Sequence, residues 1–293
     1  MSFPELLIPE TVDHAIELLH VAGRKALILG GGTLVQPFIT LGVHQHDVVI
    51  DLDQLGLNQI VIQNDRVTCG SMVRLTQLAE ALPREYIQAA VASIGGPAVR
   101  NLATVGGNIF AKPPYGDLAT LLLALDAEAE LAEAGGSRWL SLHEFYRLRD
   151  RDSISAGNTI LITRLRFRVE EKREIVFRKL ARKNLNSASV VTVALSLQFD
   201  RGTVQEARIA LGGINHHPIR ALGAERVLAG NSLSPSVIES AAQAALLGCD
   251  PQTDAYASAW YRQRMIPVQV RRALNSLTAE ERTAAMPSSP TTD

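Results

Sequence analysis

Two glycine clusters, Gly30-Gly31-Gly32-Thr33-Leu34 after the apolar run 26–29 and Thr104-Val105-Gly106-Gly107-Asn108, carry most of the information in this chain. Neither cluster fits the G-x-G-x-x-G turn of dinucleotide-binding folds or the G-x-x-x-x-G-K-[ST] turn of P-loop proteins. Glycine lets backbone N–H groups approach an anion closely, and successive N–H groups in a tight turn form an anion-binding concavity. The pair therefore predicts a phosphate-bearing ligand that is held by backbone groups.

Length and charge set the class of protein. The chain has 293 residues, of which 46% are hydrophobic, and this length suits about two domains. With 29 basic against 30 acidic side chains, no overall field favours nucleic acid or an anionic membrane. No run reaches the roughly 18 apolar residues of a membrane helix, and the first residues do not resemble a secretory signal. We expect a cytoplasmic globular protein without a nucleic-acid partner or membrane span.

No metal site or nucleophile is expected. Cys69 and Cys249 cannot supply the four thiolates of an iron–sulfur cluster or zinc site. Two buried thiols are the favoured interpretation and a disulfide is the alternative. Ser71 and Ser93 lack a G-x-S-x-G context, which argues against hydrolysis. The histidine pairs nearest to a metal-binding pattern lack a spacing such as H-E-x-x-H and are interpreted as loop residues: His44/His46 and His216/His217.

Helices and strands alternate in the first half of the chain. Val12, Ile16 and Leu19 share one helical face, with Thr11 as N-cap and Gly23 as the stop, so a helix is expected over 11–22. Short apolar runs predict strands, and longer periodic runs predict helices. The expected strands are 26–29, 48–52, 66–70 and 129–132, and the expected helices are 75–82, 87–94 and 117–125.

The pattern changes near residue 157. Residues 159–169 alternate as in a strand with one wet face, and the charged residues 170–174 are expected to form a turn or linker. Asp200-Arg201-Gly202 is typical of a hairpin turn. Strands are expected at 190–199 and 207–211, helices at 234–247 and 256–277, and a frayed tail at 286–293.

Several segments resemble, in order and spacing, the flavin-binding subunit of molybdenum-containing hydroxylases. This family includes the medium subunit of carbon monoxide dehydrogenase and the flavin domain of xanthine dehydrogenase. The glycine clusters lie in LILGGGTLVQPFI (27–39) and AVRNLATVGGNIF (98–110). The other matching segments are GDLATLLLALDAEAEL (116–131), FRKLARKNLNSASVVTVAL (177–195), RIALGGINHHPIRA (208–221) and YRQRMIPVQVRRAL (261–274).

The resemblance implies an α+β fold in two domains. Residues 1–170 would form an FAD-binding domain of the PCMH/vanillyl-alcohol-oxidase-like type, with two α/β subdomains that divide near 55–60. Residues 171–285 would form a C-terminal domain like that of the carbon monoxide dehydrogenase flavoprotein, with a three-stranded antiparallel sheet and helices.

The resemblance also implies FAD, whose pyrophosphate would lie between the two glycine clusters. The implied backbone donors are Gly31, Gly32, Thr33 and Leu34, in the turn that begins at Gly30, and Thr104, Gly106, Gly107 and Asn108.

Four further positions are implied to contact FAD. Asp117 would bind ribityl or adenosine-side hydroxyls, with helix capping as an alternative and both roles together favoured. Leu161 would meet adenine through its backbone, or be a plain core leucine. Lys179 would lie near the flavin, or on a solvated basic face with Arg178, Arg182 and Lys183. Ile94 would pack against the isoalloxazine, or be an ordinary helix-core residue.

The sequence departs from the family pattern near the expected ring. Leu34 replaces a common Ser or Asp, although its backbone donor is retained. Lys112-Pro113-Pro114-Tyr115 replaces a segment rich in His, Ala and Asp, and Asn186-Ser187 replaces an Asp followed by an aromatic or aliphatic residue. These changes leave the electron acceptor open.

The family's function gives the expected role. The chain would be an FAD-binding electron-transfer subunit that works with a large molybdopterin subunit and a small subunit with two [2Fe-2S] clusters, in a dimer of heterotrimers. The alternatives are a stand-alone FAD-dependent oxidoreductase and a degenerate scaffold or assembly subunit without FAD. Arginines in RLRDR (147–151) are interpreted as a solvated loop and Arg164, Arg166 and Arg168 as a solvated strand face, with a contact to a partner subunit as the alternative for some of them.

Overall fold

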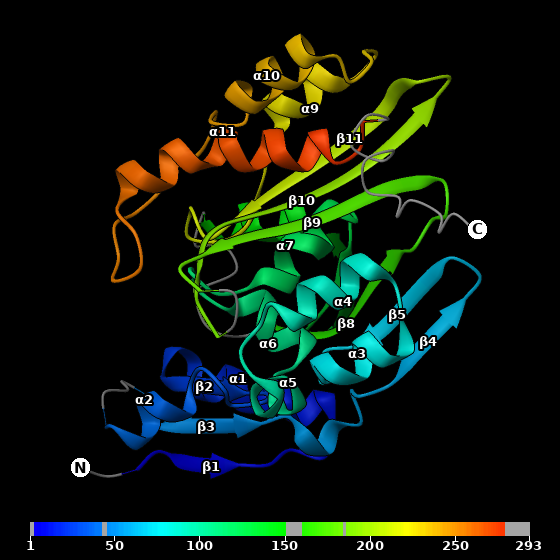
Figure 1. The fold of residues 1–293 in the computed structure, drawn as a ribbon. Coiled ribbons are helices and arrows are strands. Elements are labelled where there is room, and N and C mark those ends of the chain that lie inside the picture. Colours follow the sequence, from blue (N-terminus) through cyan, green and yellow to red (C-terminus); the bar gives the residue numbers. More distant parts are fainter. Residues whose placement is uncertain (1–2, 43–45, 151–159, 184–185, 279–293) are drawn as a thin grey trace, which may run out of the picture.

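The computed structural model describes residues 3–42, 46–150, 160–183 and 186–278. His44, Thr159, Arg151 and the predicted tail 286–293 lie outside the described residues. These described residues form three sheets, one parallel and two antiparallel (Figure 1). The α+β class is confirmed.

The described residues form strands and helices as follows. The strands are β1 Glu5–Leu7, β2 Ala26–Leu29, β3 Val48–Asp51, β4 Ile60–Gln63, β5 Arg66–Gly70, β6 Glu128–Glu133, β7 Gly136–Ser141, β8 Leu161–Arg168, β9 Arg173–Ala181, β10 Ser189–Asp200, β11 Thr203–Gly212 and β12 Ile219–Arg220. The helices are α1 Val12–Ala22, α2 Gln36–Thr40, α3 Leu75–Ala81, α4 Glu85–Ala92, α5 Pro97–Leu102, α6 Val105–Phe110, α7 Asp117–Ala124, α8 Leu142–Asp150, α9 Leu222–Leu228, α10 Pro235–Ala244 and α11 Ala259–Asn275. Gly23–Lys25 and Asp53–Leu55 are 3-10 turns.

The first sheet is parallel, in the order β1-β3-β2, and α1 packs on it (Figure 1). The predicted cap is confirmed, because the Thr11 hydroxyl accepts from the His14 N–H at 3.1 Å. Met72 and Leu161, which come from later in the chain, complete the buried cluster of this layer. The first glycine cluster leaves the sheet where β2 ends.

The second sheet is antiparallel, in the order β4-β5-β8-β6-β7. Helices α3, α4, α6, α7 and α8 contribute to the large core that covers it. Helix α7 is buried along its whole length, which explains why its sequence is apolar on all sides.

The C-terminal sheet, in the order β12-β11-β10-β9, lies between two layers of helices (Figure 1). One face contacts α4 and α7, while the other contacts α9 and α11. The implied antiparallel sheet with helices is confirmed. In addition to its three long strands, the sheet has a short fourth strand, the two-residue β12, at its edge. The sheet therefore brings β9 against α4 and β10 against α7.

The structure confirms one local prediction in the second half of the chain and differs from two others. The hairpin signal is confirmed, since Arg201 and Gly202 have φ of 50° and 80° between β10 and β11. Residues 170–174 are not entirely a turn, because Arg173 already belongs to β9, where its ladder with β10 decides the conformation. The arginine-rich segment at 147–149 is the end of α8 and not a loop.

The chain passes from the second sheet to the C-terminal sheet between Arg168 and Arg173. The expected domain limit at residue 170 stays a prediction, because a change of sheet does not by itself define an independently folding unit. The same holds for the expected division near 55–60. Within the described ranges, no helix has the length and apolar character needed to cross a membrane.

Candidate functional site

The two glycine clusters, far apart in sequence, lie against each other in the structure. A Cβ atom on Gly30 would lie 2.9 Å from Thr104 Oγ1, and one on Gly31 would lie 1.8 Å from the carbonyl oxygen of Leu102. Only glycine permits this approach. The end of β2 therefore packs directly on the segment that leads into α6.

The first cluster offers free backbone donors. Among the described residues, none accepts a hydrogen bond from the N–H groups of the four residues that follow Gly30. Gly32 has φ of 70°, which turns the chain so that its carbonyl oxygen accepts from Gln36 N–H at 2.8 Å. Unpaired N–H groups in one turn fit a diphosphate, which requires several donors at close range. These donors are Gly31, Gly32, Thr33 and Leu34.

The second cluster forms the start of α6, and its N–H groups from Val105 to Asn108 are used within the chain, whereas the Thr104 N–H has no acceptor among the described residues. Gly106 N–H donates to Ser71 O at 2.8 Å, and Gly107 N–H donates to Thr104 Oγ1 at 3.1 Å. Asn108 N–H donates to Thr104 O at 3.0 Å, as in any helix start. This cluster therefore forms part of the surface against which the first cluster packs, with the Thr104 hydroxyl next to Gly30. Its direct contact with FAD stays a prediction.

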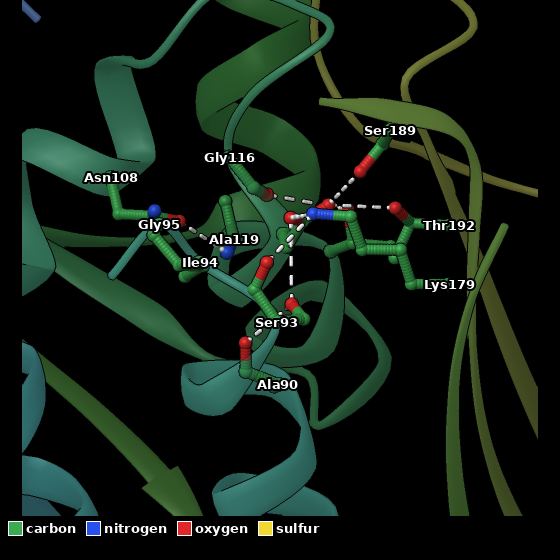
Figure 2. A network of polar contacts seen from close by, with 12 residues as sticks. Ala90, Ser93, Ile94, Gly95, Asn108, Gly116, Ala119, Lys179, Ser189 and Thr192 are labelled. Atoms are coloured by element: carbon green, nitrogen blue, oxygen red, sulfur yellow. Dashed lines mark hydrogen bonds and ion pairs between the residues drawn. The ribbon is translucent and has the colours of Figure 1, made fainter. Parts of the chain in front are cut away.

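Asp117 and Lys179 form a buried ion pair that the sequence analysis treated as two separate positions (Figure 2). Lys179 Nζ lies 2.7 Å from Asp117 Oδ2, and the two side chains are 12% and 6% exposed. The hydroxyls of Ser189 and Thr192 donate to Asp117 Oδ1 at 2.5 and 2.7 Å. The carboxylate thus keeps its charge compensated in a low-dielectric site, as a buried charge requires.

The capping role expected for Asp117 is wrong. Asp117 is the first residue of α7 after Gly116, which has φ of 90°, and the Asp117 carboxylate makes no capping bond to the helix. Its oxygens are directed to β9 and β10 instead. Ser189 and Thr192 were missed by sequence reasoning, although two hydroxyl residues in the otherwise apolar run 188–195 are a detectable signal.

Ile94 lies in the turn after α4, and two cations hold the carbonyl groups of this turn. Lys179 Nζ donates to Ser93 O at 2.8 Å, while Arg100 Nη1 donates to Ile94 O at 3.2 Å and Gly95 O at 2.7 Å. Ile94 is half-buried, which leaves part of its side chain available to a ligand. The structure therefore joins Ile94 to the Asp117–Lys179 pair.

Leu161 is not part of this group. Its side chain is 2% exposed and packs in the core of the first layer, beside Met72 and Ala132. A side-chain contact with FAD is excluded by this burial, and the implied backbone contact with adenine stays a prediction.

Lys112 and Pro113, in the segment 112–115 that differs from the family pattern, line a cavity of about 390 Å³ together with His216 and Asp254. The Tyr115 hydroxyl lies 3.2 Å from that of Tyr256, and this hydrogen bond, with burial, raises the pKa of Tyr115 to about 12. The segment therefore joins the FAD-binding part of the chain to the loop that precedes α11.

The remaining sequence hypotheses concern thiols, metals and arginines. Cys69 and Cys249 are free thiols, so the disulfide alternative is wrong, and burial raises the pKa of each to about 12. No group of three or more His, Cys, Asp and Glu side chains in the described ranges could hold a metal ion. The arginines of β8 are exposed in part and pair with carboxylates: Arg164 with Glu130, Arg166 with Glu128, and Arg168 with Asp65.

Comparison with known proteins identifies the family. Residues 2–176 match the family described as the FAD binding domain in molybdopterin dehydrogenase, and residues 175–277 match the CO dehydrogenase flavoprotein C-terminal domain. The chain is 25% identical to the glyceraldehyde dehydrogenase medium chain of Sulfolobus acidocaldarius, with 92% of this chain and 96% of the relative covered. It is 27% identical to the xanthine dehydrogenase FAD-binding subunit of Escherichia coli O157:H7, with coverage of 92% and 94%.

A solved structure agrees over nearly the whole length. The reconstituted CO dehydrogenase from Oligotropha carboxidovorans contains a chain that superposes with a TM-score of 0.82 at 26% identity, with 94% of this chain and 97% of that chain covered. This chain belongs to the FAD-binding subunits of the molybdenum hydroxylases, a family of oxidoreductases.

Proposed function

We propose that the chain is the FAD-binding electron-transfer subunit of a heteromeric molybdenum hydroxylase. It would take electrons from the [2Fe-2S] clusters of a partner subunit and pass them to an external acceptor. The free N–H groups between Gly31 and Leu34, in a turn that only glycine allows, are the observation that carries this proposal. Bound FAD supplies the redox chemistry, while the chain binds it, orients it and sets its electrostatic surroundings.

The site residues are proposed to act in three groups. The turn from Gly30 to Leu34 would hold the diphosphate, and the segment that begins α6 would pack against the other side of this turn. The Ile94 turn and the Asp117–Lys179 pair are proposed to meet the flavin itself. The proposed cofactor-binding residues are Gly30, Gly31, Gly32, Thr33, Leu34, Ile94, Thr104, Gly106, Gly107, Asn108, Asp117, Leu161 (through its backbone) and Lys179.

Partner subunits are part of the proposal. Four thiolates are needed for each iron–sulfur cluster, and Cys69 lies in the FAD-binding core while Cys249 lies beside the C-terminal core. A small [2Fe-2S] subunit and a large subunit with the molybdopterin cofactor would complete a cytoplasmic complex, in a dimer of heterotrimers. Medium chains of multisubunit dehydrogenases among the relatives support this arrangement.

Two measurements test the proposal. The purified chain, or the chain reconstituted with FAD, is expected to be yellow with the absorption bands of oxidised flavin, and a colourless chain that cannot be reconstituted would support the scaffold alternative. Affinity purification from the native host is expected to recover iron and molybdenum with two further subunits. Recovery of a yellow chain without those metals and subunits would instead support a stand-alone flavin enzyme.

A further inference from the structure

Arg262 is a fully buried arginine outside the proposed cofactor-binding residues. It lies on α11 with 1% of its surface exposed. A buried guanidinium is costly unless its donors are satisfied, because its charge has lost water. Its Nε has no hydrogen-bond partner among the described residues, so the bonds of its two terminal nitrogens indicate what Arg262 holds in place.

Three of those bonds go to backbone carbonyls. Arg262 Nη1 donates to Ser189 O at 3.2 Å, to Val190 O at 2.9 Å and also to Gly213 O. Nη2 pairs with Asp254 Oδ2 at 2.6 Å. Although burial opposes ionisation of Asp254, hydrogen bonds from Ala257 and Tyr256 N–H and from Arg262 lower its pKa, so the pair stays charged.

The Val190 carbonyl belongs to a β-bulge. In the ladder of β9 and β10, Ser189 pairs with Ala181 and Val191 pairs with Leu180, so Val190 is an extra residue without a partner on β9. A bulge interrupts the ladder and leaves backbone groups that need other partners. Arg262 supplies a donor at this point.

The bulge decides which side chains face Asp117. Side chains alternate along a strand, so residues three apart point to opposite faces. Ser189 and Thr192 are three apart, yet both hydroxyls donate to Asp117 Oδ1. The extra residue at Val190 makes this possible, and accordingly Val190 and Val191 both pack in the core on the opposite face.

Ser189 is thereby fixed at three atoms. Its N–H donates to Pro114 O at 3.1 Å, its carbonyl accepts from Arg262, and its hydroxyl donates to Asp117. Displacement of the carbonyl would move the hydroxyl, since both belong to one residue in a closely packed strand. Asp117 in turn holds Lys179, as drawn in Figure 2.

We propose that Arg262 is a positioning residue for the flavin site: it holds the bulge at Val190, and through the Ser189 hydroxyl it fixes Asp117 and Lys179. The inference rests on the proposed function, because Lys179 must face the flavin for the effect to reach it. The C-terminal domain thus sets the charge geometry of a site built mainly by the FAD-binding domain.

The test compares R262M and R262K with R220M in the FAD-loaded chain. Arg220 pairs with Glu225 through two bonds of 2.6 and 2.9 Å in the same domain and is 12% exposed, but it does not touch the bulge. R220M and R262M are both expected to lower the melting temperature. Only the Arg262 variants are expected to change the visible circular dichroism and the midpoint potential of bound flavin, with R262K changing them less. Wild-type values for both in R262M would overturn the proposal.

S189A separates positioning from general destabilisation, and it also serves if R262M does not fold. It removes the hydroxyl but leaves the carbonyl that Arg262 binds. S189A is expected to reproduce the change in potential, and adding R262K to S189A is expected to change it little further. Additive effects of S189A and R262K would overturn the proposal.

A measurement without flavin distinguishes this inference from the proposed function. Urea unfolding of the apoprotein is followed for R262K, S189A and the double variant. The free energies of unfolding are expected not to add, since both substitutions release the same residue, Ser189, at its hydroxyl and at its carbonyl. A wild-type chain that binds no FAD would refute the proposed function, whereas additive free energies would refute the positioning role.

Discussion

The α-carbon of Gly31 lies so close to Leu102 that a methyl group on it would come within 1.8 Å of the Leu102 carbonyl oxygen. The atoms that such a methyl group would meet belong to the backbone of Leu102 and Ala103, so no side-chain movement could relieve the clash. The position of the turn with the free N–H groups therefore depends on the backbone at Leu102 as well as on its own sequence.

Gly31→Ala is expected to displace the turn and to abolish FAD retention, since the donors would lose their common direction. FAD release during gel filtration and the melting temperature measure this. Gly96→Ala is the matched control, because a Cβ at Gly96 would meet only Asn186 at an ordinary 3.5 Å. Full retention of FAD by the Gly31 variant would show that the first cluster does not bind the diphosphate.

Arg74 holds the Leu102 backbone against which the first glycine cluster packs. Its Nη1 donates to Leu102 O at 2.6 Å and its Nη2 pairs with Asp53 Oδ1 at 2.9 Å. Arg74→Met is expected to weaken FAD binding about tenfold, as loss of one charged hydrogen bond costs about 1.5–3 kcal/mol and this one acts indirectly. Arg138→Met, which removes a surface pair with Glu133, is expected to leave the affinity unchanged in the same fluorescence titration. Equal affinities for the two variants would remove Arg74 from the site.

Features that depend on neighbouring residues could be predicted from the sequence. Features that depend on strand pairing between distant segments could not. Gly30 and Thr11 could be interpreted from their neighbours, because turn and cap preferences act over a few residues. The Asp117 site could not, since Ser189 reaches it only through a bulge that has no sequence signal of its own. Helix α6 was missed for a related reason: glycines disfavour helix, but the Thr104 cap and the packing of Gly106 on Ser71 outweigh that preference.

Strand β9 shows the same limit. Its residues are charged at Arg173, Arg178 and Lys179, and every position is only half-buried. Pairing with β10 along its length, and burial of Lys179 against Asp117, make it a strand. The alternative of a solvated basic face is therefore wrong for Lys179.

Lys179→Met is expected to lower the midpoint potential of bound flavin while leaving FAD binding largely intact. A cation near the ring favours the reduced and more negative form, and the Ser189 and Thr192 hydroxyls still hold Asp117 in the variant. Spectroelectrochemical titration measures the potential. Lys172→Met, at an exposed position before β9, is the control. An unchanged potential in the Lys179 variant would place this ion pair away from the flavin.

Glu130 is expected to make the stability of the FAD-binding domain depend on pH. Hydrogen bonding from Arg164, aided by Thr163, lowers the pKa of this carboxyl below its ordinary 4.5 in spite of burial. A carboxyl with a lowered folded-state pKa contributes stability above its unfolded pKa, and this contribution is lost as the pH falls through the folded value. Glu130→Gln is therefore expected to cost about 1–3 kcal/mol at pH 7. Its deficit is expected to shrink as the pH falls below 4.5.

Urea unfolding at a series of pH values measures this difference. Glu133→Gln, whose partner Arg138 lies on the surface, is expected to cost little at any pH, because exposed pairs contribute little. The sign is decisive for Glu130. A deficit that grows on acidification would mean that burial, and not the bonds from Arg164 and Thr163, dominates the energy of the Glu130 carboxylate. A constant deficit would mean that the two effects cancel, and it would equally contradict the lowered pKa.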